Sequence, residues 1–261
     1  MITTVLSDKD LEKMAPAIFA KTPADFVSDR YTFVPTNRII DEFRALDFFP
    51  VRAQQVQARS EEEMRVGKHL VSLRHKDSLN EMNKVGDSVP EILLANAHNW
   101  QTSYQLRGAI FRFICENGMI VADQEFGDIR QIHKEFNVDD IVLASKQFLG
   151  EMGDTFEKVE TFKSIELDPT QMRQFGRTAA RLRWEDAGDV MGERVLEARR
   201  TLDEGTNLWL TMNRAQENLI RGGFKNHETN RTVREVTGID SNLEINEKLW
   251  GITEEFAHRL N

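Results

Sequence analysis

Aromatic and cationic side chains gather in two stretches of the sequence. The first stretch holds Trp100, Tyr104, Arg107 and Arg112. The second stretch carries cations only: Arg214, Arg221, Lys225, Arg231 and Arg234. Aromatic rings stack on unpaired bases, and cations bind the phosphates between them. The two stretches therefore predict a surface that binds DNA, and single-stranded DNA in particular.

Both stretches also have a purely structural interpretation. Gly222 and Gly223, which follow Arg221, would let backbone amides approach a phosphate. The same glycines fit an ordinary helix end, with Phe224 making its hydrophobic contact. Arginines inside an apolar run need partners. Arg107 and Arg112 are therefore also expected to pair structurally, with Glu91 or Glu116.

The sequence predicts no catalytic residue, metal ligand set or cofactor site. The six histidines form no His-Glu-x-x-His or Cys/His pattern. Cys115, the only cysteine, could act as a nucleophile with His98 only as an exposed thiolate. Its apolar neighbours instead favour a place in the core. A metal site assembled only by the fold remains an open alternative.

Composition and charge set the class of protein. The chain has 261 residues, of which 40% are hydrophobic and 30% charged, as in soluble globular proteins. No apolar run is long enough to span a membrane. The N-terminus has no secretion pattern and a single cysteine allows no internal disulfide, so we expect a cytoplasmic protein.

The net charge of −9 argues against a protein that coats nucleic acid by bulk attraction. The charge is uneven, however. Residues 171–234 contain 12 Lys and Arg against 9 Asp and Glu, a balance of +3, and the rest of the chain has a balance of −12. A locally basic surface on an acidic protein is one interpretation, and a salt-bridged helical face is the other.

The N-terminal half is predicted to form a mainly antiparallel sheet. A helix capped by Ser7 or Asp8 should reach Ala20, and another, capped by Thr36 or Asn37, should reach Leu46. Alternating or β-branched runs predict the following strands: Tyr31–Pro35, Phe49–Arg59, Lys68–Arg74, Val89–Ala97, Tyr104–Ile114, Met119–Val121 and Asp128–His133. A helix over 104–114 is the main alternative.

The C-terminal half is predicted to be helical. Asp168-Pro169 should begin a helix that ends near Trp184, and a longer one should cover 190–221 with a break near Gly205. A last amphipathic helix covers 246–260. The fold class is therefore α+β, with a sheet region over 1–137 and a helical region over 138–261, packed on the sheet as one domain.

The chain resembles the domain of unknown function 932 family in an ordered set of short segments. These are Val34–Thr36, Phe49–Val51, Lys68-His69, Val89–His98, Tyr104–Val121, Arg221–Gly223, and Asn246 with Leu249-Trp250. The set covers nearly the whole chain. The resemblance implies a gene of phages or conjugative plasmids, and it assigns no enzyme chemistry.

We expect a non-enzymatic mobile-element protein that binds single-stranded DNA in recombination or annealing. A homo-oligomer is expected, because one domain of this size contacts few nucleotides. Two alternatives stay open. One is an interaction protein that engages a host defence protein through its acidic N-terminal part, and the other is an undetected nucleic-acid enzyme.

Overall fold

The computed structural model divides the chain into two compact units. The first comprises residues 1–118 and 124–152, and the second comprises 119–123 and 153–261. Within them the structure describes residues 4–28, 31, 33–80, 88–100, 102, 104–112, 118–120, 129–131, 157–226 and 229–260. The expected boundary at 137/138 lies outside the described residues.

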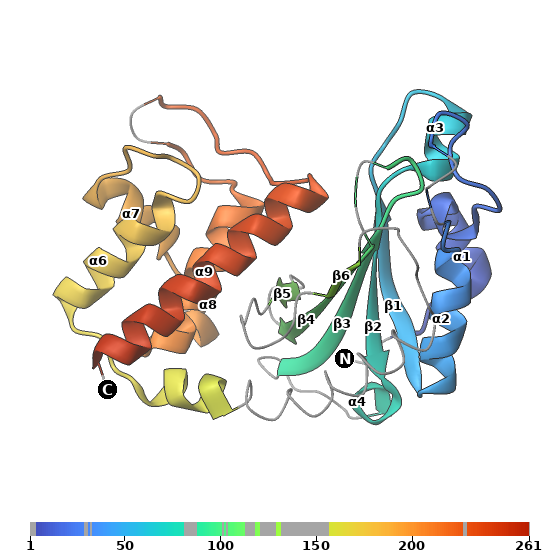
Figure 1. Ribbon diagram of the computed structural model, residues 1–261. Coiled ribbons are helices and arrows are strands. Elements are labelled where there is room, and N and C mark those ends of the chain that lie inside the picture. The colour runs from blue at the N-terminus through green and yellow to red at the C-terminus, as the bar shows by residue number, and fades with distance from the viewer. Residues whose placement is uncertain are drawn as a thin grey trace. The chain divides into compact units, whose positions relative to one another are not determined.

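The first unit is built on an antiparallel sheet (Figure 1). Its main strands are β1 (Phe48–Gln55), β2 (His69–His75), β3 (Ser88–Asn96) and β4 (Tyr104–Arg112), which pair in that order. A short strand, β6 (Ile129–Gln131), pairs with β4, and another, β5, covers Gly118–Ile120. The expected antiparallel sheet of the N-terminal part is confirmed.

Strand β3 lies between β2 and β4, and its apolar composition suits that central position. Ile92 is in register with Leu73 on one side and with Gly108 on the other. The run over 105–112 pairs with β3 residue by residue, so the alternative of a helix there is wrong. Aromatic and β-branched residues favour such a pleated, half-buried surface.

Helices cover one face of this sheet and form the core with it. They are α1 (Asp8–Met14), the 3-10 helix η1 (Pro16–Phe19) and α2 (Thr36–Ala45). Two further short helices, α3 (Glu61–Val66) and α4 (Lys76–Asn80), follow β1 and β2 in the chain. Figure 1 shows α1 and α2 against the sheet. The core joins Leu11, Ile39 and Phe43 of these helices to Val71, Leu94 and Tyr104 of the strands. Periodic apolar residues thus drive helix and sheet together.

Three expectations in this region are wrong in detail. Ser7 caps α1 as expected, but the α-helix ends at Met14 because Pro16 begins a 3-10 turn. The described residues among 31–35 form no strand. A side-chain hydrogen bond holds this stretch instead of strand pairing: Tyr31 Oη donates to the Ala97 carbonyl (3.0 Å). Helix α2 takes Pro35 as its N-cap, because the Thr36 hydroxyl is engaged by His69.

The second unit is helical, as expected. Residues 157–164 are helical, followed by α6 (Pro169–Ala180), α7 (Asp189–Val195), the 3-10 helix η2 (Thr201–Asp203), α8 (Leu208–Arg221) and α9 (Ile239–Leu260). The side chain of Asp168 caps α6 by accepting from the amides of Thr170 and Gln171, and the Asp168 backbone N–H donates to Gln171 Oε1 in return. The expected start of this helix is confirmed. The helix ends at Ala180 rather than Trp184.

The helix expected over 190–221 is interrupted over twelve residues, 196–207, and not only near Gly205. It separates into α7 and α8, and residues 196–207 form turns with the short η2 between them. The reason is tertiary, because Arg199 and Arg200 in this connection turn inward and bind residues of α8.

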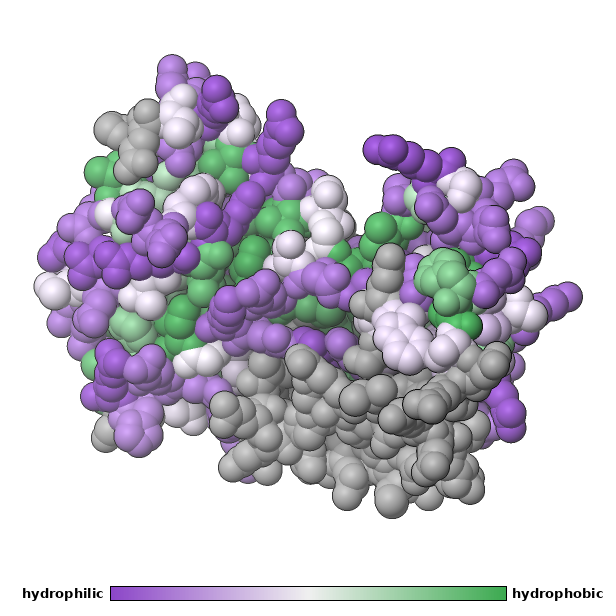
Figure 2. Space-filling view, turned by 45° about the horizontal axis from the view of Figure 1, so that its top comes forward, coloured by the Kyte–Doolittle hydropathy of each residue, from purple (hydrophilic) through white to green (hydrophobic). Residues whose placement is uncertain are grey.

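In Figure 2 hydrophilic side chains cover much of the visible described surface, and hydrophobic ones occupy smaller areas. Across the described residues, no helix combines the length and the hydropathy that crossing a bilayer would require.

Candidate nucleic-acid interface

A hairpin follows helix α8 and carries three of the predicted cations. The chain leaves α8 through Gly222, whose φ of +58° favours glycine, and its two arms cover 222–226 and 229–236. Three backbone hydrogen bonds join the arms: Gly223 N to Val233 O (2.9 Å), Val233 N to Phe224 O (2.8 Å) and Asn226 N to Arg231 O (2.9 Å). The expected helix end at the glycines is confirmed.

The cations on this hairpin are Lys225, Arg231 and Arg234. All three are exposed. Among the residues that the structure describes, none of the three side chains forms an ion pair or a hydrogen bond. Most other arginines of 171–234 bind carboxylates or carbonyls within the unit, as Arg177 does with Asp189. Among the described residues, the salt-bridged interpretation of the basic region holds for Arg177, Arg194, Arg200 and Arg221. Several other arginines bind backbone carbonyls instead, and the hairpin carries three cations with neither kind of partner in the described part of the chain.

An aromatic pair lies beside the hairpin cations. The rings of Trp184 and Phe224 meet edge to face, with centroids 6.0 Å apart and planes at 68°. Both side chains are half-buried. The guanidinium of Arg183 lies over the Trp184 ring, 5.1 Å from its centroid. Trp184 and Arg183 were not among the predicted residues, although an aromatic residue directly beside a cation was a signal available in the sequence.

Arg183 fixes the hairpin to helix α8. Its guanidinium donates to the carbonyl of Leu219 (2.5 Å) and to the carbonyl of Arg234 on the outgoing arm (3.1 Å). Burial lowers the pKa of this guanidinium below its usual value. The hairpin is therefore held at its base by a charged side chain as well as by its own backbone bonds.

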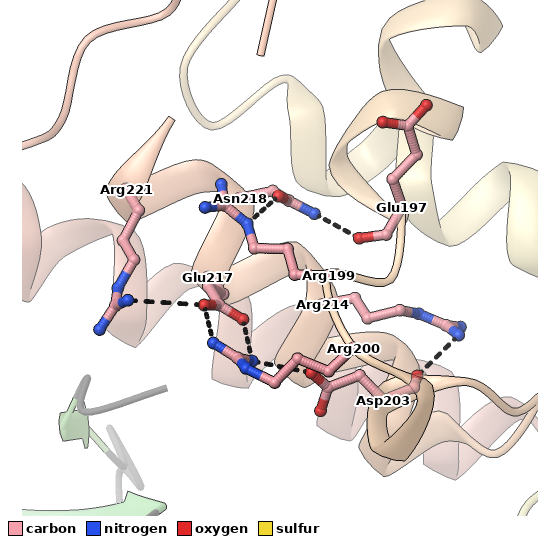
Figure 3. Close-up of polar contacts among 8 residues, drawn as sticks. All are labelled: Glu197, Arg199, Arg200, Asp203, Arg214, Glu217, Asn218 and Arg221. Carbon is pink, nitrogen blue, oxygen red and sulfur yellow. Dashed lines mark hydrogen bonds and ion pairs between the residues drawn. The ribbon is translucent and has the colours of Figure 1, made fainter. Parts of the chain in front are cut away.

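A buried polar network supports α8 beneath the hairpin (Figure 3). Arg199 donates to Asn218 Oδ1 (2.8 Å) and also binds the Gly222 carbonyl. Arg200 bridges Glu217 and Asp203. Helix α8 buries polar side chains along almost its whole length, and several of them, Glu217 and Asn218 among them, have partners in the preceding connection.

Two predicted cations belong to this network rather than to the exposed surface. Arg221 is half-buried and pairs with Glu217, Nη1 to Oε1, at 3.8 Å. Arg214 is buried and donates to the carbonyls of Asp203 and Gly205. Both side chains have a structural role in the second unit.

The predicted residues of the first stretch lie in the other unit. Trp100 is 57% exposed, with a φ of +64°, and its ring lies 6.0 Å from that of Tyr31. Tyr104 is completely buried, and burial raises the pKa of its hydroxyl. Arg107 is half-buried and donates to Gln105 Oε1 (3.0 Å). The side chain of Arg112 lies outside the described part of the chain.

Among the described side chains, Glu91 is paired with arginines other than the expected Arg107. Its buried carboxylate accepts from Arg74 and Arg52, at 2.5 Å each. Arg74 is itself 1% exposed. The expected partner Glu116 lies outside the described residues. This triad is a structural ion-pair cluster on β1, β2 and β3.

Two buried histidines near β3, His69 and His98, contact backbone carbonyls and a hydroxyl inside the first unit. His98 is buried, and its Nε2 lies 3.0 Å from the carbonyl oxygen of Ala17. His69 places Nε2 2.8 Å from the Thr36 hydroxyl and Nδ1 2.9 Å from the Gly67 carbonyl, and burial lowers its pKa to about 4. Cys115 lies outside the described residues. Within the described ranges, no three His, Cys, Asp or Glu side chains converge as a metal site would need.

Comparison with known proteins identifies the family. Residues 23–250 match the model of the domain of unknown function DUF932, and the chain belongs to this family. It is 32% identical over 259 residues to the UPF0380 proteins YfjQ and YafZ of Escherichia coli strain K12. Each alignment covers 98% of this chain and 93% of the relative. No solved structure matches the chain.

Proposed function

We propose that this member of the DUF932 family binds single-stranded DNA through the hairpin of its helical unit. The observation that carries the proposal is the set of three exposed cations, Lys225, Arg231 and Arg234, which have no anionic partner among the described residues. They would hold the phosphates of the strand. Recombination or annealing on a mobile element is the setting that the family resemblance suggests.

The aromatic pair supports a single strand rather than a duplex. Trp184 and Phe224 offer ring surface beside the cations, and ring faces are useful only to bases that are not already paired and stacked. The phosphates of a duplex could bind the cations, but its paired bases could not stack on the two rings. The combination of rings and cations is typical of sites that follow a single strand.

The charge of the whole chain limits the mode of binding. With a net charge of −9, distant attraction is weak, so the interaction must be local and sensitive to salt. Glu235 follows Arg234 directly and is also exposed, which lowers the local positive potential. A small site of this kind gains affinity when several copies bind one strand, consistent with the oligomer we propose.

The test is fluorescence anisotropy across a salt series. Labelled single- and double-stranded oligonucleotides of about 20 nucleotides exceed the site of a single small domain. We expect salt-sensitive binding that favours the single strand. In the triple variant Lys225→Ala, Arg231→Ala, Arg234→Ala, the slope of log K against log salt should fall by about 2, since each lost phosphate contact removes about 0.7.

A matched variant separates the hairpin from charge in general. Lys163, Arg173 and Arg259 are exposed cations of the same unit, and their replacement by Ala removes the same charge. We expect this control to bind as the unchanged protein does. Equal losses in both triple variants would show non-specific attraction, and no binding at low salt would overturn the proposal.

A protein partner is the second candidate function. Phe26 is 74% exposed and Trp100 is 57% exposed, both in the first unit. Exposed aromatic side chains are enriched at protein interfaces. A pull-down that recovers one stoichiometric host protein, lost on Phe26→Ala and Trp100→Ala, would support this function if DNA binding is absent.

A further inference from the structure

A pocket lies at the base of the same hairpin. It has a volume of about 400 Å³. Three segments of the second unit line it: Leu182-Arg183 after α6, Glu235–Gly238 at the end of the hairpin, and the first turns of α9 from Ser241 to Lys248. Arg183 belongs both to this pocket and to the aromatic pair, because its guanidinium lies over the Trp184 ring. Arg183 therefore links the pocket to the aromatic pair beside it.

The lining combines three kinds of group. Leu182, Val236 and Ile245 provide apolar contact. Thr237 and Ser241 provide hydroxyls, and Arg183 and Lys248 provide cations. Two carboxylates complete it, Glu235 and Glu244, and Lys248 binds Glu244 at 2.5 Å. Polar and charged groups outnumber the three apolar side chains in this lining, and such groups fix the orientation of a small ligand.

This combination of groups limits the chemical classes of ligand that the pocket can bind. Two carboxylates disfavour a simple anion, and two cations disfavour a simple cation. A ligand with a flat apolar body, amino donors and an attached phosphate satisfies all three kinds of group. A nucleotide that carries an amino-bearing base, adenine or cytosine, has this composition, since carboxylates accept from the exocyclic amines of bases.

We propose that this pocket takes one unstacked nucleotide with an amino-bearing base from the strand held by the hairpin. The inference rests on the proposed function and deepens it. The apolar side chains contact the faces of the base, a carboxylate accepts from its amino group, and Arg183 lies toward the phosphate. A base must leave its stack to enter, so a single strand binds more readily than a duplex.

The test compares three single strands of equal length: oligo-dC, oligo-dT and an abasic strand with the same phosphates. We expect the unchanged protein to bind oligo-dC about tenfold more tightly than oligo-dT, the scale of one hydrogen bond to a charged group. The Ser241→Phe variant fills the pocket from an exposed position. It should bind oligo-dC no better than oligo-dT, with the salt slope unchanged.

Two controls keep the result interpretable. Ser164→Phe adds the same ring at an exposed serine of this unit outside the pocket, and it should keep the preference for oligo-dC. Glu244→Gln tests the carboxylate without filling the space and should reduce the preference. Equal midpoints of urea unfolding would show that the variants are folded.

The outcomes separate the two proposals. If the unchanged protein binds oligo-dC, oligo-dT and the abasic strand equally, or if Ser241→Phe keeps the preference, the pocket does not take a base, while the hairpin proposal stands. If no strand binds at low salt, the proposed function fails and the pocket inference fails with it.

Discussion

Arg200 holds the carboxylate of Glu217 through two hydrogen bonds, Nη2 to Oε1 at 2.6 Å and Nη1 to Oε2 at 2.9 Å. Glu217 is 4% exposed. This paired contact raises the pKa of Arg200 above its usual value. It joins the connection before α8 to the middle of that helix. The geometry explains why a helix that supports the exposed hairpin can bury so many polar groups.

We expect the Arg200→Ala variant to lose about 2 kcal/mol of unfolding free energy. Removing one partner of a buried pair costs about 3–5 kcal/mol, because the other charge is left without compensation. The side chain of Arg200 is 31% exposed, so water can replace part of the contact. Urea unfolding followed by circular dichroism measures the change.

The Arg194→Ala variant is the control for this pair. Arg194 binds Glu197, but both side chains are about half exposed. Surface pairs contribute about 0–1 kcal/mol. A loss in Arg194→Ala as large as that in Arg200→Ala would mean that the buried network does not distinguish the two arginines.

Replacing Trp184 of the second unit and Trp100 of the first unit tests which of the two units binds DNA. We expect Trp184→Ala to weaken single-strand binding about tenfold, because one stacked base is worth about 1–3 kcal/mol. Trp184→Phe should retain most of the affinity, since a smaller ring still stacks. Anisotropy at one fixed salt concentration measures both variants.

Trp100→Ala provides the comparison in the first unit. Trp100 is exposed beside Tyr31, and the sequence alone placed it in the binding surface. We expect its replacement to leave DNA binding unchanged. A loss in Trp100→Ala with none in Trp184→Ala would move the interface to the first unit.

The two stretches show what sequence patterns can predict here. Strands β3 and β4 and the capping of α6 by Asp168 follow from local patterns, because alternation, branching and caps act within a few residues. Lys225 and Arg231 were predicted from residue type alone, and their role in binding stays a prediction. The role of Arg183 was not predicted, since its partners are carbonyls 36 and 51 residues away in the chain.

The burial of polar side chains was the second feature that could not be predicted from the sequence. Nothing local distinguishes Arg221, which pairs with Glu217, from Arg231, which is exposed. Tyr104 likewise has the composition of a stacking residue but lies in the core. Only the tertiary arrangement decides whether a polar or aromatic side chain faces water.

His69 predicts a pH dependence of stability in the first unit. Its pKa is lowered from 6.5 to about 4, chiefly by burial. Between these values the unfolded chain binds a proton that the folded protein does not, so stability falls as the pH falls from about 6.5 to 4. The contribution amounts to about 3 kcal/mol at the lower end.

The measurement is urea unfolding between pH 7.5 and pH 4, compared with His69→Gln. The variant should show a shallower loss of stability over this window, because one buried titrating group is gone. His258→Gln removes an exposed imidazole at the end of α9 and serves as the control. If His69→Gln and the unchanged protein keep parallel profiles, buried His69 does not govern the acid sensitivity.

Gly192 of α7 and Gly176 of α6 let the two helices touch through their backbones. A Cβ added to Gly192 would lie 2.6 Å from the backbone nitrogen of Arg177, and one added to Gly176 would lie 2.5 Å from the Gly192 carbonyl oxygen. Backbone atoms cannot move aside as a side chain does. We therefore expect Gly192→Ala to destabilise the protein by about 1–3 kcal/mol, the usual cost of overpacking.

At Gly251 the same substitution, glycine to alanine, should change stability in the opposite direction. It lies inside α9, where an added Cβ meets no atom within 4 Å. Alanine is the better helix former by about 0.8–1 kcal/mol, so Gly251→Ala should stabilise the protein by up to that amount. Urea midpoints of the two variants, measured beside the unchanged chain, test both directions at once. Stabilisation of Gly192→Ala would show that α6 and α7 are not in backbone contact, because helix propensity alone would then decide both results.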